Sequence, residues 1–223
     1  MPNLDQLLPE ITDPRRLQAL ESTGLLDSPP EKAFDGLTDL VAKLVSAPVS
    51  LVSLVDSDRQ FFKSQCGLQE PWASKRETRL SHSFCKHVVA TRESLVVNNA
   101  PEHPLVRKNL AVRDLGVVAY LGLPLFTPDD EVIGSLCAID SRTRVWSQDD
   151  IDVMSVLANA VMNEIAVRMY IDRIQTFNEN LQVSNENLEK DASNLKVLCA
   201  RVASRGTRVP KAATVTPLRA ANG

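Results

Sequence analysis

A β-hairpin is encoded in residues 49–66, which read VSLVSLVDSDRQFFKSQC. Residues 49–55 are β-branched and apolar apart from two serines, as is typical of a buried strand. Residues 56–58, Asp-Ser-Asp, have the composition of a turn, and residues 60–66 form a second strand-like run. Two such runs around a short polar turn predict a pair of antiparallel strands.

Three further strands are predicted toward the C-terminus, at residues 95–97, 117–126 and 132–139. Short helices are predicted between the strands, at residues 83–90 and near residues 106–112. The strands and helices do not alternate in a strict β-α-β order. The sequence therefore predicts an α+β fold with an antiparallel sheet.

Two helices are predicted upstream of the hairpin. Asp13 can cap the first helix with Pro14 at its first position, and Gly24 ends it. After Ser28-Pro29-Pro30, apolar residues at helical spacing between Phe34 and Val45 predict the second helix. Residues 1–13 are expected to be an N-terminal tail.

A long helix without internal glycine or proline is predicted from Ser147 to about Val202. Its apolar residues recur every seven positions at the d positions Val167, Ile174, Leu181, Leu188, Leu195 and Val202, with Ile171, Asn178, Asn185, Ala192 and Cys199 at the a positions. Leu at d with Asn at a favours a parallel two-stranded coiled coil. Residues 168–203 are therefore expected to join two copies of the chain. The predicted interface residues are Ile171, Ile174, Asn178, Leu181, Asn185, Leu188, Leu195 and Val202.

The charge of the chain is distributed unevenly. The 223 residues hold 25 Lys+Arg and 28 Asp+Glu, for a net charge of −3. Residues 201–223 contain no acidic residue and five basic ones, which are Arg201, Arg205, Arg208, Lys211 and Arg219. Residues 204–223 are expected to be a disordered basic tail. The acidic remainder argues against a nucleic-acid-binding core.

Several classes of protein are disfavoured by composition and motifs. The longest mainly apolar stretch, residues 115–126, is about half the ~20 residues of a membrane-spanning helix. The N-terminus lacks the pattern of a secretory signal, so a cytoplasmic location without membrane association is expected. The chain has no G-x-G-x-x-G or Walker-type loop. Its four cysteines form no C-x-x-C pair, which argues against a zinc ribbon or a disulfide framework.

Four stretches resemble the GAF domain family of bacterial sensory proteins. They are residues 19–31 (ALESTGLLDSPPE), 49–64 (VSLVSLVDSDRQFFKS), 83–87 (SFCKH) and 133–140 (IGSLCAID). The resemblance covers residues 14–167 and implies a sheet of five or six antiparallel strands. It also implies that the first and last helices lie on one face of the sheet and a ligand pocket on the other. GAF domains usually precede a kinase, cyclic-di-GMP or phosphatase output domain, and we expect none in this chain.

The resemblance leaves the ligand and the cofactor open. Cyclic-nucleotide-binding members carry an N-K-x-F-x-D-E pattern that has no equivalent here. Bilin-binding members carry Cys followed directly by His, whereas this chain has Cys85-Lys86-His87. Helix residues i and i+2 point about 200° apart, which argues against a bilin bound by both side chains and against a Cys/His catalytic dyad. His82 and Cys85 could share a face, but a metal or haem site would need His103 or Cys137 as well.

The predicted function is that of a sensory module without enzymatic activity. A small molecule would bind in the GAF pocket, and the coiled-coil homodimer would transmit the signal to a partner such as a kinase or a cyclase. The candidate ligand-binding residues are Phe84, His87, Arg113, Asp114, Tyr120 and Cys137. One alternative is a dimeric adaptor whose pocket is empty or filled by side chains. Another is a methionine sulfoxide reductase that uses Cys66, Cys85 and Cys137, because a GAF-like reductase family uses three cysteines.

Overall fold

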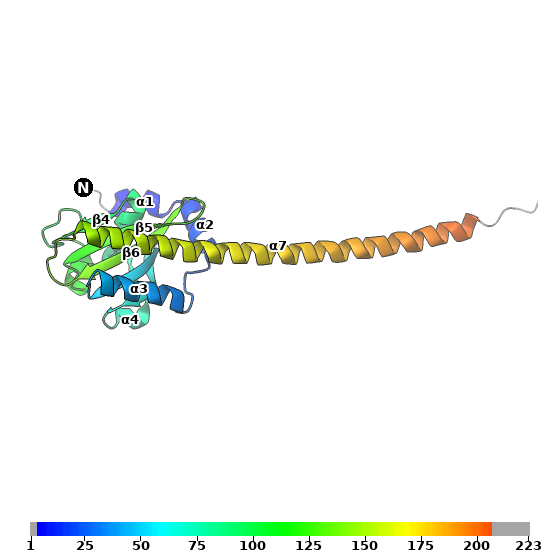
Figure 1. Ribbon diagram of the computed structural model, residues 1–223. Coiled ribbons are helices and arrows are strands. Elements are labelled where there is room, and N and C mark those ends of the chain that lie inside the picture. Colours follow the sequence, from blue (N-terminus) through cyan, green and yellow to red (C-terminus); the bar gives the residue numbers. More distant parts are fainter. Residues whose placement is uncertain (1–3, 207–223) are drawn as a thin grey trace, which may run out of the picture. The chain divides into compact units, whose positions relative to one another are not determined.

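The computed structural model describes residues 4–206 (Figure 1). In chain order the elements are α1 (Leu4–Ile11), α2 (Pro14–Ser22), α3 (Lys32–Leu44), β1 (Val49–Val55), β2 (Arg59–Cys66), α4 (Trp72–Lys75), β3 (Glu77–Arg79), the 3-10 helix η1 (Leu80–His82), α5 (Cys85–Thr91), β4 (Leu95–Val97), α6 (Leu110–Asp114), β5 (Ala119–Phe126), β6 (Val132–Asp140) and α7 (Gln148–Gly206).

Six antiparallel strands form one sheet in the order β3-β2-β1-β6-β5-β4. The hairpin predicted in residues 49–66 is confirmed as β1 and β2, which are neighbours in this sheet. The central strand β1 pairs with β2 on one side and with β6 on the other, with Leu51 opposite Cys137. The predicted α+β class with an antiparallel sheet is therefore confirmed.

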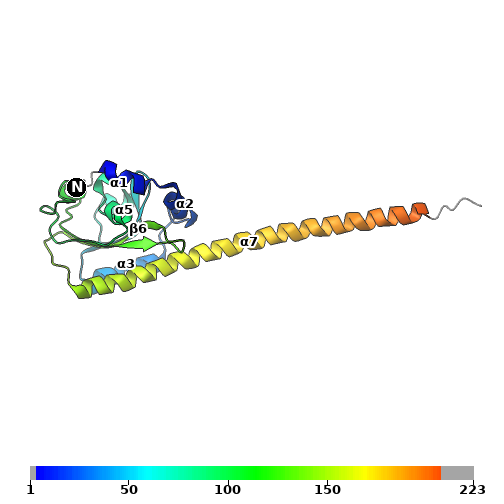
Figure 2. The same ribbon diagram turned by 90° about the horizontal axis from the view of Figure 1, so that it is seen from above.

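The sheet is covered by helices on both faces (Figure 2). One hydrophobic cluster contains Phe34 of α3, Leu136 of β6 and Val161 of α7. A second cluster contains Ile11 of α1 and Val88 of α5. Side chains alternate between the faces of a strand, so consecutive residues of β6 supply different clusters. Helices α3 and α7 thus pack on one face of the sheet, and α1 and α5 on the other.

The two helices predicted upstream of the hairpin are present as α2 and α3. The Asp13 carboxylate caps α2 by accepting a hydrogen bond from the backbone amide of Arg15 at 2.8 Å, and Pro14 takes a place in the first turn. These positions suit the two residues because the first turn of a helix leaves amide groups unpaired and proline lacks one.

Residues 1–13 were expected to be a tail, but residues 4–11 form α1. Leu7 and Ile11 are buried against the rest of the domain, which gives this short helix the tertiary packing that it needs. Arg16 fixes the corner after α1, because its buried guanidinium donates hydrogen bonds to the carbonyls of Ile11 (2.9 Å) and Val55 (2.7 Å).

A buried ionic cluster joins α7 to the segment before α3. Lys63 of β2 is fully buried, and its ammonium donates hydrogen bonds to Ser28 Oγ (2.6 Å), to the Pro29 carbonyl (2.8 Å) and to the Glu31 carboxylate. Arg168 of α7 pairs with the other oxygen of the Glu31 carboxylate. The cluster therefore connects a strand, a loop and α7.

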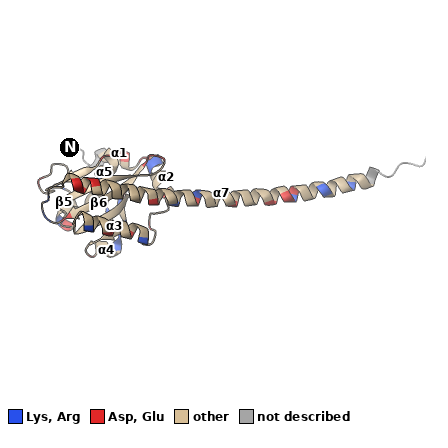
Figure 3. Cartoon of the chain, viewed as in Figure 1, with Lys and Arg blue, Asp and Glu red and all other residues tan. Residues whose placement is uncertain are grey.

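The chain divides into two units, one ending at Asp172 and the other beginning at Arg173. Acidic residues stand at the start of α7, in the first unit (Figure 3). The described part of the second unit is helical, and its side chains are exposed from residue 173 to residue 204. Residues 207–223 of the expected basic tail lie outside the described residues. Within residues 4–206, no helix is both long and apolar enough to cross a membrane.

Candidate functional site

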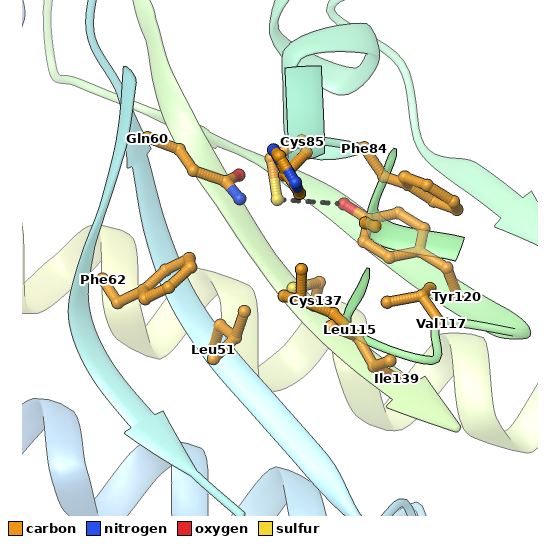
Figure 4. A pocket seen from close by; sticks show the side chains of 12 residues that line it. Leu51, Gln60, Phe62, Phe84, Cys85, Leu115, Val117, Tyr120, Cys137 and Ile139 are labelled. Atoms are coloured by element: carbon orange, nitrogen blue, oxygen red, sulfur yellow. Dashed lines mark hydrogen bonds between the residues drawn. The ribbon is translucent and has the colours of Figure 1, made fainter. Parts of the chain in front are cut away.

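A small cavity lies between the sheet and the cover formed by η1, α5 and α6. Its lining residues are Leu51, Gln60, Phe62, His82, Phe84, Cys85, Ala111, Leu115, Val117, Tyr120, Cys137 and Ile139. The volume is about 20 Å³, enough for about one water molecule. The side chains that line the cavity come from the sheet and from its cover (Figure 4), and they leave little free space between them.

The sheet side of the cavity is made by residues that share a face on neighbouring strands. Leu51, Tyr120 and Cys137 come from β1, β5 and β6. Register places Leu51 and Gly122 on either side of Cys137. A Cβ atom at Gly122 would lie 2.1 Å from the Tyr120 hydroxyl, so the glycine makes room for the Tyr120 side chain.

Thiol and hydroxyl groups gather around Tyr120. Its hydroxyl donates a hydrogen bond to Cys85 Sγ at 3.3 Å (Figure 4). The same hydroxyl lies 3.3 Å from Ser135 Oγ. Ser53 Oγ donates to Gln60 Oε1 at 3.3 Å. All five residues are buried, so their polar groups depend on one another rather than on solvent.

The environment separates the acidities of these groups. Hydrogen bonds from Cys137 first, and from Tyr120, Ser53 and Ser135, outweigh burial and lower the pKa of Cys85 to about 7. Burial raises the pKa of Tyr120 and that of Cys137 well above their ordinary values. Cys85 is therefore the first group of the cluster to become anionic, and the others remain proton donors to it.

Two short segments form the rim of the cavity. His82 of η1 has its Nε2 atom 3.0 Å from Asp114 Oδ2 at the end of α6, and its ring packs against Trp72 with centroids 5.7 Å apart. Asn109 caps α6 and donates from Nδ2 to the Ser83 carbonyl at 2.9 Å. These contacts hold η1 and α6 together over the cavity.

The structure brings three of the six candidate ligand-binding residues into the cavity lining: Phe84, Tyr120 and Cys137. Arg113 is exposed and pairs with its neighbour Asp114, which reaches the rim through His82. His87 is buried in α5 but does not line the cavity, and its Nδ1 atom has no hydrogen-bond partner. Gln60 and His82, which were not among the candidates, do line it.

The cysteines of the reductase hypothesis do not all meet. Cys85 and Cys137 share the cavity, whereas Cys66 lies outside its lining, at the end of β2. Cys85 lines the cavity while His87 does not, as the i, i+2 spacing predicts. Among residues 4–206, no group of three or more His, Cys, Asp or Glu side chains is arranged to hold a metal ion.

Comparison with known families assigns the chain. The GAF domain model matches residues 29–165, which include the whole sheet, α5 and the start of α7. The chain belongs to the GAF domain family. The resemblance seen in the sequence is thereby confirmed, and the chain carries a GAF sensory domain.

Two curated bacterial proteins are similar to this GAF chain. A cyclic di-GMP phosphodiesterase of Pseudomonas aeruginosa is 28% identical over 148 residues, which is 66% of this chain and 24% of that protein. The diguanylate cyclase DgcP of Escherichia coli is 29% identical over 69 residues, 31% of this chain and 20% of that protein. The chain thus spans about a quarter or less of the length of these relatives.

Solved GAF structures share the fold. The GAF domain of an Acinetobacter phosphoenolpyruvate-protein phosphotransferase superposes with a TM-score of 0.53 at 17% identity, covering 73% of this chain and 99% of that one. A free methionine-R-sulfoxide reductase of Neisseria meningitidis gives a TM-score of 0.50 at 18% identity, covering 77% of this chain and 90% of that one. At these identities the likeness concerns the fold alone.

Proposed function

We propose that this chain is a cytoplasmic sensory module in which a small molecule at the GAF cavity controls a parallel homodimeric coiled coil. The dimer would pass the signal to a partner protein such as a kinase or a cyclase. One of the two curated relatives supports a cyclase as the partner, because it is a diguanylate cyclase. No membrane or nucleic-acid partner is part of the proposal.

The heptad pattern on α7 carries this proposal. The d residues Val167, Ile174, Leu181, Leu188, Leu195 and Val202 are all between 45% and 64% exposed in the single chain. Covering a continuous row of large apolar side chains with another surface is favourable in water, and such a row is typical of an interaction surface. A second copy of the same helix offers the same repeat and therefore fits.

Two polar features favour a parallel pairing in register. Asn178 and Asn185 occupy a positions, where each would face the Asn of a second copy and satisfy its amide. Asp191 and Lys196 occupy successive g and e positions, which approach each other between chains only in a parallel coil. An antiparallel or out-of-register pairing would leave Asn178 and Asn185 without an Asn partner and would separate Asp191 from Lys196.

Strand β6 gives the cavity a short route to α7. Cys137 lines the cavity, while its neighbours Leu136 and Ala138 belong to the opposite hydrophobic cluster, which includes Met154 of α7. A shift of β6 caused by a molecule in the cavity would therefore be felt by the helix. Tightly packed clusters pass such displacements on because they contain little free space.

The segment between β6 and α7 is also held firmly. Arg144 donates to the Ser46 carbonyl (3.0 Å) and to the Asp150 carboxylate (3.0 Å), and Trp146 Nε1 donates to the Val97 carbonyl (3.1 Å). These hydrogen bonds fix the position of the segment between β6 and α7, so a displacement of the strand would be passed to the helix.

The small cavity volume favours a second candidate, an adaptor whose pocket is filled by its own side chains. Native mass spectrometry of the freshly purified chain separates the two. A copurified small molecule would support the sensor. If no molecule copurifies and none added changes dimerisation, the adaptor is correct.

Cys199 offers a direct test of the coiled coil. It lies at an a position, so oxidation should link two chains through Cys199 in a parallel, in-register dimer. The matched control is Ser193→Cys in a Cys199→Ser background, which places the thiol at an outward b position and should cross-link poorly. Equal cross-linking at both positions, or a monomer in sedimentation analysis, would contradict the proposed dimer.

A further inference from the structure

Two thiols from different elements meet at the cavity. Cys85 begins α5 and Cys137 lies in the middle of β6, yet both line the same space of about 20 Å³. Both thiols are free and buried. We infer that Cys85 and Cys137 form a redox pair, which hydrogen peroxide entering the cavity oxidises to an intramolecular disulfide.

The positions of the two side chains support the pair. Cys85 points from the helix toward the sheet, and Cys137 points from the sheet toward it (Figure 4). The two thiols line the same small cavity, together with the Tyr120 hydroxyl, which donates to Cys85 Sγ at 3.3 Å. A disulfide needs a short Cβ separation and opposed side chains, and two cysteines on opposite walls of a cavity of about 20 Å³ are placed for this.

The size of the cavity selects the oxidant. The available space holds about one water molecule, and hydrogen peroxide is the two-electron oxidant nearest to water in size and polarity. Disulfides such as oxidised glutathione, and hydroperoxides with a bulky alkyl group, do not fit. The cavity lining is mainly apolar, but His82, Gln60 and the Tyr120 hydroxyl supply polar groups.

The hydrogen bonds around Cys85 favour its reaction. The thiolate is the form of cysteine that attacks a peroxide, and the pKa of Cys85 of about 7 makes that form accessible near neutral pH. The raised pKa of Cys137 keeps the second thiol protonated until it is needed. The pair thus contains one attacking and one resolving cysteine.

The two steps balance with one peroxide molecule. The Cys85 thiolate attacks one peroxide oxygen, the O–O bond breaks, and Cys85 becomes a sulfenic acid while hydroxide leaves and takes up a proton to form water. Cys137, losing its proton, then attacks the Cys85 sulfur and displaces the hydroxyl group as a second water. Two thiols are oxidised to one disulfide and one hydrogen peroxide is reduced to two waters.

This reaction deepens the proposed function, on which it rests, because it names the chemical input of the same cavity. The disulfide would tie α5 covalently to β6, the strand that also packs beneath α7. Oxidation would therefore act on the route proposed for the signal.

The test uses the full chain carrying Cys66→Ser and Cys199→Ser, so that only the cavity thiols remain. After treatment with hydrogen peroxide and blocking of free thiols, the intact mass should fall by two hydrogen atoms, and peptide mapping should find Cys85 linked to Cys137. A bulky alkyl hydroperoxide should react at least about tenfold more slowly because it does not fit the cavity.

Three variants in this background separate the roles. Cys137→Ser should stop at a sulfenic acid on Cys85 that dimedone traps, whereas Cys85→Ser should leave Cys137 reduced. Tyr120→Phe keeps the ring, removes the hydroxyl donor to Cys85 and should slow oxidation several-fold.

Two results would overturn the redox pair. One is that both thiols stay reduced at peroxide concentrations that oxidise the exposed Cys199 of the parent chain. The other is that the bulky hydroperoxide reacts as fast as hydrogen peroxide. The failure of the redox pair can be told apart from failure of the dimeric sensor, because mass spectrometry reads the disulfide whether or not the chain dimerises.

Discussion

The Tyr120 hydroxyl donates a hydrogen bond to Cys85 Sγ across 3.3 Å, which joins β5 to α5 inside the domain. The Tyr120 ring also packs against Phe84, with centroids 5.3 Å apart, and its side chain occupies the space left by Gly122. Tyr120 therefore lines the cavity and also hydrogen-bonds the thiol at the start of α5. A molecule that enters the cavity therefore has to contact or displace the Tyr120 side chain.

Removal of the Tyr120 hydroxyl should weaken the domain. Tyr120→Phe leaves Cys85 and Ser135 without their shared partner in a buried site, and we expect a loss of about 1–2 kcal/mol in the free energy of unfolding. Urea unfolding measures this loss. Tyr170→Phe is the matched control because Tyr170 is half exposed on α7 and should change stability little. Equal effects of the two variants would show that the buried network contributes nothing.

Gly122→Ala should displace Tyr120. The new methyl group would lie 2.1 Å from the Tyr120 hydroxyl, so the ring has to move and the hydrogen bond to Cys85 should be lost. Overpacking of this kind costs about 1–3 kcal/mol in the free energy of unfolding. Gly36→Ala in α3 meets no atom within 4 Å and should be neutral or slightly stabilising. A crystal structure of Gly122→Ala with Tyr120 unmoved would refute this prediction.

Lys63 should be important for stability rather than for binding. Lys63→Met leaves the Pro29 carbonyl and the Glu31 carboxylate without their buried ammonium donor, for an expected loss of about 2–3 kcal/mol in the free energy of unfolding. The control is Lys32→Met, which removes the exposed lysine next to Glu31 in the sequence and should change the free energy of unfolding by less than about 0.5 kcal/mol. Comparable unfolding midpoints for both variants would argue against the ionic cluster.

The parts of the fold that could be predicted from sequence are those with a strong periodic pattern. The strands at residues 49–55 and 132–139 are runs rich in β-branched and apolar residues, and the polar turn at residues 56–58 indicates the strand that follows it. Helix α7 follows from its heptads. In contrast, β3 has three residues of mostly polar character at the edge of the sheet, and α1 contains Pro9, so neither has a pattern that sequence rules recognise.

The cavity lining could be predicted only in part. Tyr120 and Cys137 follow from the alternation of side chains on strands. Gln60 and His82 depend on features that sequence does not reveal: a register shift between Val52 and Ser53 where β1 meets β2, and the fold of a 3-10 turn over the sheet. His87 does not line the cavity because residues two apart on a helix point in different directions. Its side chain is directed away from Cys85, into the interior near Lys86 and His103.

The stability of the domain should fall in acid because of His87. Burial first, and then the charges of Lys86 and His103, lower the pKa of His87 from 6.5 to about 4. The unfolded chain binds a proton below pH 6.5 that the folded protein refuses until about pH 4. The free energy of unfolding should therefore be insensitive to His87 above pH 6.5. It should fall between pH 6.5 and pH 4 by up to about 1.4 kcal/mol per unit.

Urea unfolding across this pH range tests the His87 prediction. His87→Gln should flatten the fall between pH 6.5 and pH 4, because the glutamine side chain does not titrate there. An imidazole NMR titration of His87 with a midpoint near 6.5 in the folded protein would contradict the prediction.

The coupling between the cavity and the coiled coil is tested most directly by the dissociation constant of the homodimer. Sedimentation equilibrium would compare the reduced chain, the peroxide-treated chain and Gly122→Ala, with Gly36→Ala as the control, all in the Cys66→Ser, Cys199→Ser background. Coupled sites change each other's equilibria by about fivefold or more, so the two cavity perturbations should shift the dissociation constant by at least that factor and the control should not. A dimer with the same dissociation constant in all four samples would contradict a sensor that signals through its coiled coil.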